Sequence, residues 1–145
     1  MSAAGTACGG SSSPAPSAGD VSLVIGGLST TFPGSTCTRD FPGTRGADGT
    51  TLFLSFTYSI SQGTLTGGHV QLVRAYNTGD SETQTFAIPS DFLTMTGTTF
   101  GTIRVGACPR YNDATVSMET LTLFDAAGHS SNALTVSLTK PAGAL

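Results

Sequence analysis

Tryptophan is absent from this sequence of 145 residues, and charged side chains are scarce. Asp, Glu, Lys and Arg make up 10% of the chain, whereas average soluble domains contain about 25%. Arginine occurs five times and lysine once, and the formal net charge is −3. Because this composition leaves no basic stripe to neutralise phosphates, we do not expect nucleic-acid binding.

Long apolar runs and helical spacing are missing as well. No stretch of about 18 apolar residues occurs, so no transmembrane segment is predicted. The first residues contain neither the charged nor the apolar region of a secretory signal peptide. Residues 90–95 allow a single helical turn at most. With a mean hydropathy of +0.12, the chain is nevertheless expected to fold, as one all-β domain.

The three cysteines, Cys8, Cys37 and Cys108, are an odd number. Cys37 and Cys108 lie in the patterned part of the chain, whereas Cys8 lies in a segment without structural pattern. In an oxidising compartment we expect a Cys37–Cys108 disulfide, which leaves Cys8 for another role. Three free thiols in a cytosolic protein are the alternative. The disulfide interpretation places the protein outside the cell or on its outer surface.

Residues 1–20, MSAAGTACGGSSSPAPSAGD, contain no bulky apolar side chain after the initial Met. Small residues with Pro and Gly bury too little surface to offset the cost of ordering, so we predict a flexible tail here and a domain over residues 21–145. The tail resembles the junction of bacterial lipoproteins, with the small residues GTA before Cys8 and a linker after it. It departs from that pattern in lacking a preceding apolar stretch and the usual Leu. The resemblance implies a lipid anchor on Cys8.

From residue 21 onward apolar and polar residues alternate, which is the pattern of half-buried strands. The clearest case is residues 51–60, where one parity holds Leu52, Leu54, Phe56, Tyr58 and Ile60. Further strands are predicted near residues 21–25, 70–76, 83–88, 100–105, 115–124 and 134–139.

The segment 115–124 changes parity along its length. Val116 and Met118 share one parity, and Leu121 and Leu123 share the other. A one-residue bulge near Glu119 and Thr120 would bring all four apolar side chains to one face.

About seven short strands separated by polar turns predict an antiparallel β-sandwich. Residues 121–141, LTLFDAAGHSSNALTVSLTKP, resemble the closing strand pair of bacterial immunoglobulin-like repeats, which often reads D-x-x-G-x-x-S-N before alternating Val and Thr. The resemblance implies an immunoglobulin-like sandwich and carries no catalytic or binding residue. Because Cys37 precedes the strand at 51–60, the predicted bridge would tie loops at one pole.

No constellation of catalytic residues is evident. His69 and His129 have no local Ser and Asp partners of the kind a triad requires, so both are interpreted as solvated turn residues and a hydrolase is the least favoured function. Zinc-ligand spacing is absent. We predict no cofactor; calcium is the weaker alternative. Its oxygen ligands would come from predicted loops, at Asp40, Asp48, Asp113 and Asp125.

The predicted bridge would join residues 37–49 to residues 108–113, and three of the five arginines lie in these two loops. Arg and Tyr dominate binding hot spots because they combine contact area with directional hydrogen bonds. The alternative is that the Arg–Asp pairs only brace a long loop. We predict a partner-binding pole formed by Arg39, Asp40, Phe41, Arg45, Arg110 and Tyr111.

Together these features predict a non-enzymatic structural or interaction module that binds a protein partner or copies of itself. A subunit of a surface filament is one version, because edge strands without charged gatekeepers tend to pair with neighbours. A carbohydrate-binding or adhesive module is the alternative, with Tyr111 as its only loop aromatic candidate of the three tyrosines.

Overall fold

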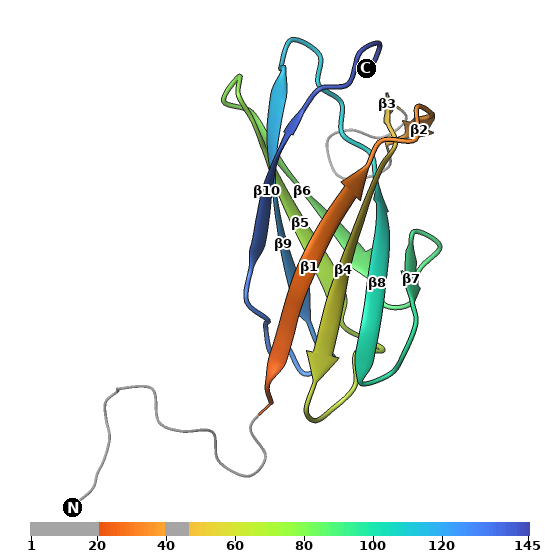
Figure 1. Ribbon diagram of the computed structural model, residues 1–145, viewed down its shortest axis with the longest axis vertical. Coiled ribbons are helices and arrows are strands. Elements are labelled where there is room, and N and C mark those ends of the chain that lie inside the picture. Colours follow the sequence, from red (N-terminus) through yellow and green to blue (C-terminus); the bar gives the residue numbers. More distant parts are fainter. Residues whose placement is uncertain (1–20, 40–46) are drawn as a thin grey trace, which may run out of the picture.

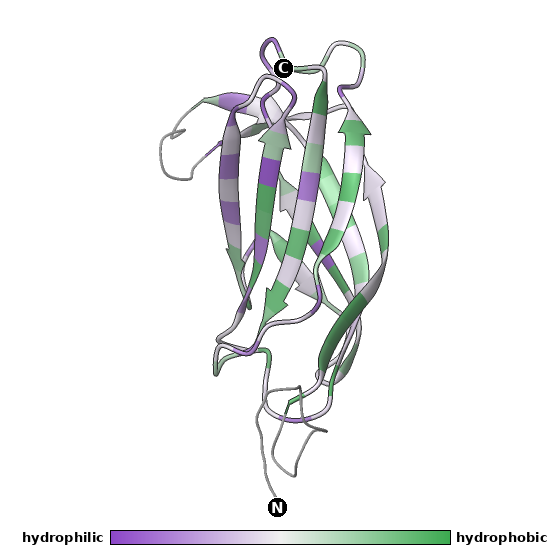
Figure 2. Ribbon diagram, turned by 90° about the vertical axis from the view of Figure 1, so that its left-hand side faces the viewer, coloured by the Kyte–Doolittle hydropathy of each residue, from purple (hydrophilic) through white to green (hydrophobic). Residues whose placement is uncertain are grey.

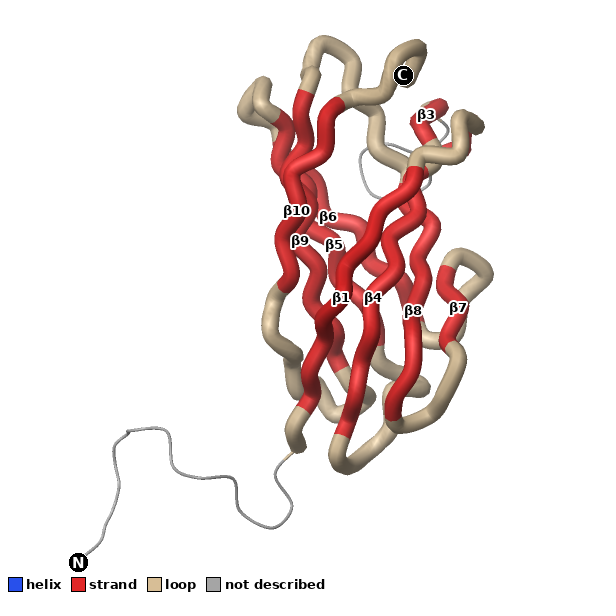
Figure 3. The backbone as a smooth tube through the Cα atoms, in the orientation of Figure 1, coloured by secondary structure: helices blue, strands red, loops and turns tan. Residues whose placement is uncertain are grey.

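The computed structural model describes residues 21–39 and 47–145. Every regular element in these two ranges is a strand (Figure 3). The predicted tail over residues 1–20, including the lipidation candidate Cys8, lies outside the described residues. Among the residues that are described, none belongs to a helix long and apolar enough to span a membrane.

The described residues form two four-stranded antiparallel sheets and one short strand pair. The first sheet has the order β1-β4-β8-β7, the second β10-β9-β5-β6, and β2 pairs with β3. The large sheets lie face to face as two layers (Figure 1). The strands are β1 (Leu23–Thr31), β2 (Thr36–Thr38), β3 (Asp48–Thr50), β4 (Leu52–Ile60), β5 (His69–Tyr76), β6 (Ser81–Ala87), β7 (Leu93–Met95), β8 (Phe100–Ala107), β9 (Val116–Phe124) and β10 (Leu134–Thr139).

Each of the seven long strands overlaps a segment predicted from alternation, although β1 extends six residues beyond the predicted 21–25, and the all-β prediction is confirmed. Sequence reasoning missed the three short strands, because three residues are too few to show a period. One of them, β7, occupies the segment in which at most a helical turn was expected. It pairs with Ile103–Val105 of β8.

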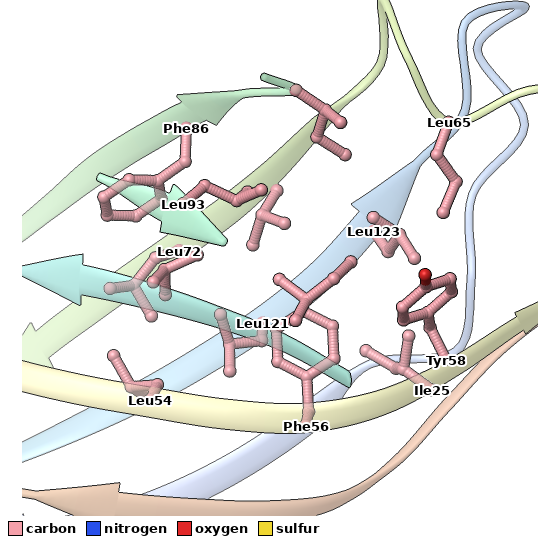
Figure 4. Packing of buried hydrophobic residues seen from close by; sticks show 14 of the residues in the cluster. Ile25, Leu54, Phe56, Tyr58, Leu65, Leu72, Phe86, Leu93, Leu121 and Leu123 are labelled. Carbon is pink, nitrogen blue, oxygen red and sulfur yellow. The ribbon is translucent and has the colours of Figure 1, made fainter. Parts of the chain in front are cut away.

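The core lies between the two sheets and follows the predicted alternation of β4. All five apolar residues of that parity are buried. Leu72 of β5 and Leu121 and Leu123 of β9 approach them from the second sheet (Figure 4). Burying a side chain of this size contributes about 1.5–3 kcal/mol, so this cluster is the main source of stability.

The predicted bulge in β9 is wrong. The strand pairs with β5 and β10 without a shift in register, and Glu119, Leu121 and Leu123 all point inward and are buried. Met118 points outward and is 50% exposed. The prediction assumed that the apolar Met118 would be buried and the charged Glu119 exposed. Both assumptions are wrong, because Glu119 is buried in an ion pair with Arg74 of β5.

An irregularity occurs instead in β1, between Gly26 and Ser29. Gly27 has a φ of +59°, a left-handed conformation that glycine adopts without strain. Near this point the edge of β1 is closed by a side chain. Oδ1 of Asn132 accepts a hydrogen bond from the Ile25 amide at 2.8 Å, and Nδ2 donates to the Ile25 carbonyl at 2.9 Å.

Two substitutions on β9 test its corrected parity. Leu121→Ala should lower the free energy of unfolding by about 2–5 kcal/mol, because it leaves a cavity in the core. Met118→Ala should change it by less than about 0.5 kcal/mol, since that side chain faces outward. Urea titration of both variants measures the difference, and equal losses would contradict the assigned register.

Candidate functional site

The disulfide lies at the pole where β4 begins and β5 and β8 end, at the top of Figure 1. Cys37 of β2 and Cys108, which follows β8, have sulfur atoms 2.02 Å apart and Cα atoms 6.0 Å apart. This is the pair that the sequence predicts. Because 71 residues separate the two cysteines in sequence, the bridge should contribute roughly 4 kcal/mol by the chain-entropy model.

The bridge brings Arg39 into the interior. Arg39 directly follows β2 and is 5% exposed. Its Nε donates to the Cys108 carbonyl at 2.9 Å, and its Nη2 lies 2.5 Å from Oε2 of Glu82 on β6. The guanidinium group therefore connects the bridged segment to the second sheet.

Glu82 belongs to a row of three charged residues on neighbouring strands of that sheet. Arg74 of β5 lies directly opposite Glu82 of β6 and Glu119 of β9 in the register. Nε of Arg74 lies 2.9 Å from both carboxylate oxygens of Glu119, and its Nη1 lies 2.5 Å from Oε2 of Glu82. Hydrophilic bands lie across the strands of this sheet (Figure 2).

Arg39, Arg74, Glu82 and Glu119, here called the charge cluster, carry two positive and two negative charges. Arg74 and Glu119 are both fully buried, and buried charges are tolerated only when paired. Burial alone would lower the pKa of Arg74, but interactions with Glu119, and to a smaller extent with Tyr76 and Glu82, more than offset this and raise it. Nη2 of Arg74 has no hydrogen-bond partner among the described residues.

Two tyrosines close the cluster towards the pole. The Tyr76 hydroxyl donates to Oε2 of Glu82 at 3.0 Å and accepts from the Arg110 amide at 3.0 Å. Burial raises the pKa of Tyr76 to about 12, so the phenol is neutral at physiological pH. Tyr111 packs edge-on against Tyr76 with ring centroids 5.6 Å apart, and its hydroxyl lies 2.9 Å from that of Ser117.

The predicted partner-binding pole is only partly at the surface. Arg39 and Tyr111 are buried, which corrects their assignment as residues that contact a partner directly. Arg110 is half-buried, and its Nε donates to Asn112 at 2.9 Å. The remaining candidates, Asp40, Phe41 and Arg45, lie outside the described residues.

The sequence contains a signal for the charge cluster. Arg74 falls at an inward position of β5, between Leu72 and Tyr76. Glu119 falls at an inward position of β9 in the same way. Two opposite charges that interrupt two apolar faces indicate that these faces meet in a buried pair.

Of the loop aspartates proposed as calcium ligands, the three that are described do not converge. Asp113 and Asp125 lie at opposite ends of β9, and Asp40 is not among the described residues. No group of three or more His, Cys, Asp or Glu side chains within metal-binding reach occurs in the described ranges.

Asp125 has a local role instead. Its Oδ1 accepts hydrogen bonds from the backbone amides of Ala127 and His129, and its Oδ2 lies 2.8 Å from Nδ1 of His129. Burial opposes ionisation of this carboxyl group, but the hydrogen bonds from His129 outweigh it and lower the pKa of Asp125. His69 stacks on Phe124 with ring centroids 4.6 Å apart. Both histidines thus serve local packing.

The outer face of the second sheet is uncharged. Its four strands are fully described, and alternate residues point away from the core. Thr120 of β9 and Thr135 of β10 pair across it with hydroxyls 3.2 Å apart. The outward residues, here called the outer face, are His69, Gln71, Val73, Ala75, Ser81, Thr83, Thr85, Ala87, Val116, Met118, Thr120, Thr122, Phe124, Thr135, Ser137 and Thr139.

Comparison with known proteins gives no family. No family model matches the chain, and no curated protein matches its sequence. The X-ray structure of a Northeast Structural Genomics Consortium target aligns with 84% of this chain and 89% of its own, at 13% identity and a TM-score of 0.42. A likeness at this level assigns neither fold family nor function.

Removing one charge from the cluster should be costly, and removing a pair should not. Glu119→Leu leaves two buried guanidinium groups facing one carboxylate, and should lower the free energy of unfolding by about 3–5 kcal/mol. Arg74→Met with Glu119→Leu leaves Arg39 paired with Glu82 and should recover most of that loss. Urea titration measures both. A double variant less stable than Glu119→Leu alone would contradict the charge-balance argument.

Proposed function

We propose that this protein is a non-enzymatic structural or interaction module of an exported protein, with immunoglobulin-like architecture. The strand order supports the architecture. Immunoglobulin domains have one sheet of strands A-B-E-D and a second that contains G-F-C. The orders β1-β4-β8-β7 and β10-β9-β5-β6 follow the same scheme, with β6 as an added strand beside β5. The disulfide supports an oxidising compartment.

The outer face is the observation on which the proposed function rests. Strands lie about 4.8 Å apart and rise about 3.3 Å per residue, so four strands of about eight residues cover about 500 Å² before side-chain relief is counted. A standard protein interface buries about 800 Å² on each partner. The face is thus of the right order for a lateral contact.

Composition makes the outer face suitable for such a contact. Covering charged groups requires their desolvation, which can exceed the Coulombic gain of pairing them. The outer face carries no Asp, Glu, Lys or Arg on its four described strands, and two of its apolar side chains, Val73 and Met118, are exposed. We infer that it packs against a protein partner or against another copy of the chain.

A carbohydrate-binding or adhesive module remains the alternative proposal, with less support. Sugar sites usually offer an exposed aromatic platform, and the tyrosine nominated for that role, Tyr111, is buried.

A charge placed on the outer face tests the proposal. Thr120→Lys should weaken association at least about tenfold, equivalent to about 1.4 kcal/mol, while leaving the melting temperature unchanged. Thr102→Lys is the matched control, because Thr102 is exposed on the outward side of the other sheet. Sedimentation velocity over a concentration series measures self-association. Weakening by Thr102→Lys but not by Thr120→Lys would place the contact on the first sheet and contradict the proposal.

A further inference from the structure

A cleft of about 480 Å³ opens beside the disulfide, between the edge of β6 and the end of β8. Small-molecule sites typically measure about 300–1,000 Å³, and an engineered cavity of about 150 Å³ already binds benzene. The space is therefore large enough for more than one ring. Its walls include Phe53, Phe86, Ala87, Phe92, Gly106 and Ala107, together with both bridged cysteines.

The strand arrangement explains why the cleft is open. Both β6 and β7 are the last strands of their sheets. Because β7 pairs only as far as Val105, β8 continues beyond it to Ala107 without a strand partner on that side among the described residues. The Gln84 side chain of β6 spans the gap, and its Oε1 accepts a hydrogen bond from the Cys108 amide at 3.4 Å. The disulfide fixes this end covalently.

The lining is mostly apolar, and among the described residues its polar members, Thr38, Thr51, Gln84, Thr85 and Ser90, are uncharged. Phe86 is buried, whereas Phe92 is 68% exposed, an unusual state for a phenylalanine ring. Gly106 leaves room beside the Phe53 ring. A Cβ atom there would lie 3.5 Å from Cε1 of Phe53, which is an ordinary contact, so packing does not require the glycine.

Charged side chains lie next to the cleft. A smaller hollow of about 150 Å³ shares Phe53, Phe92 and Gly106 with the cleft and is also lined by Asp91 and Arg104. The Arg104 guanidinium carbon lies 3.8 Å above the centre of the Phe53 ring. A small-molecule site of this kind typically combines apolar walls with a few polar groups that fix orientation.

We propose that the cleft binds an uncharged, largely apolar small molecule. Its apolar body lies against Phe86 and Phe92, and its polar end reaches the hollow that holds Arg104 and Asp91. The neutral lining selects against a charged body, because no side chain there compensates the desolvation of a charge. The proposal does not depend on the outer-face contact proposed above, although Thr85 and Ala87 of β6 border both surfaces.

Fluorescence titration with N-phenyl-1-naphthylamine, a neutral aromatic probe, tests this site. The oxidised wild-type protein should bind one probe saturably, and added salt should have little effect, because no charged side chain lines the cleft. Phe92→Ser removes a ring from the wall and Ala87→Asp adds a charge. Each should weaken binding at least about tenfold. Both residues are exposed, so the melting temperature should stay unchanged.

Phe100→Ser and Ala133→Asp are the matched controls, because both residues are exposed and neither lines the cleft. They should bind the probe as the wild type does. Absence of saturable binding to the wild type, or equal binding by all four variants, would overturn the proposal. So would a change in sedimentation with Phe92→Ser at unchanged probe affinity, which would make the cleft a contact between copies.

Discussion

The buried pairing of Arg74 with Glu119 is the interaction on which the arrangement of the second sheet depends. The three strands β6, β5 and β9 place Glu82, Arg74 and Glu119 side by side. A slip of one residue in either pairing would turn a charge outward and leave its partners buried without compensation. An apolar core tolerates such slips better than an ion pair does. The charge cluster therefore specifies register, while the leucine and phenylalanine core supplies most of the stability.

The disulfide extends this constraint to a short segment that is also held by hydrogen bonds, among them that of the Thr50 amide to the Pro109 carbonyl at 2.7 Å. The hairpin of β2 and β3 forms a sheet of its own, and Cys37 connects it to the end of β8. The bridge places Arg39 next to Glu82, which gives that carboxylate a second positive partner besides Arg74. The disulfide and the Arg39–Glu82 ion pair thus lie at the same pole. Arg39 and Tyr111, which were assigned to a binding surface at this pole, are buried and make contacts within the protein. The two surfaces proposed for contacts are the outer face and the cleft.

Sequence alone predicted those parts of the fold that alternation dictates. The strand β4 is the best case, because each apolar residue of one parity is buried. The alternation rule failed in β9, where Met118 is exposed and Glu119 is buried. The rule considers the hydrophobicity of each residue alone and takes no account of an ion-pair partner, here Arg74, on another strand. The disulfide was predicted because only two of the three cysteines lie in patterned sequence.

The candidate site was harder to predict, for a physical reason. Arg39 and Tyr111 were assigned to a binding surface from residue type, but burial depends on the packing of segments far apart in sequence. The cleft carries no motif at all. It arises where β7 ends before β8 does, and its walls come from β2, β4, β6 and β8. A feature made by the relative lengths of edge strands leaves no local signature.

The central claim is that the disulfide positions Arg39 within the charge cluster, and a thermodynamic cycle tests it most directly. Arg39→Met is measured in the bridged protein and in a protein with both Cys37 and Cys108 replaced by alanine, using urea titration. In the bridged protein the substitution should cost about 3–5 kcal/mol, because it leaves Glu119 and Glu82 facing Arg74 alone. Without the bridge the cost should fall by at least about 1 kcal/mol, within the range measured for coupled residues. An equal cost in both backgrounds would show that Arg39 reaches Glu82 without the bridge and would contradict the account.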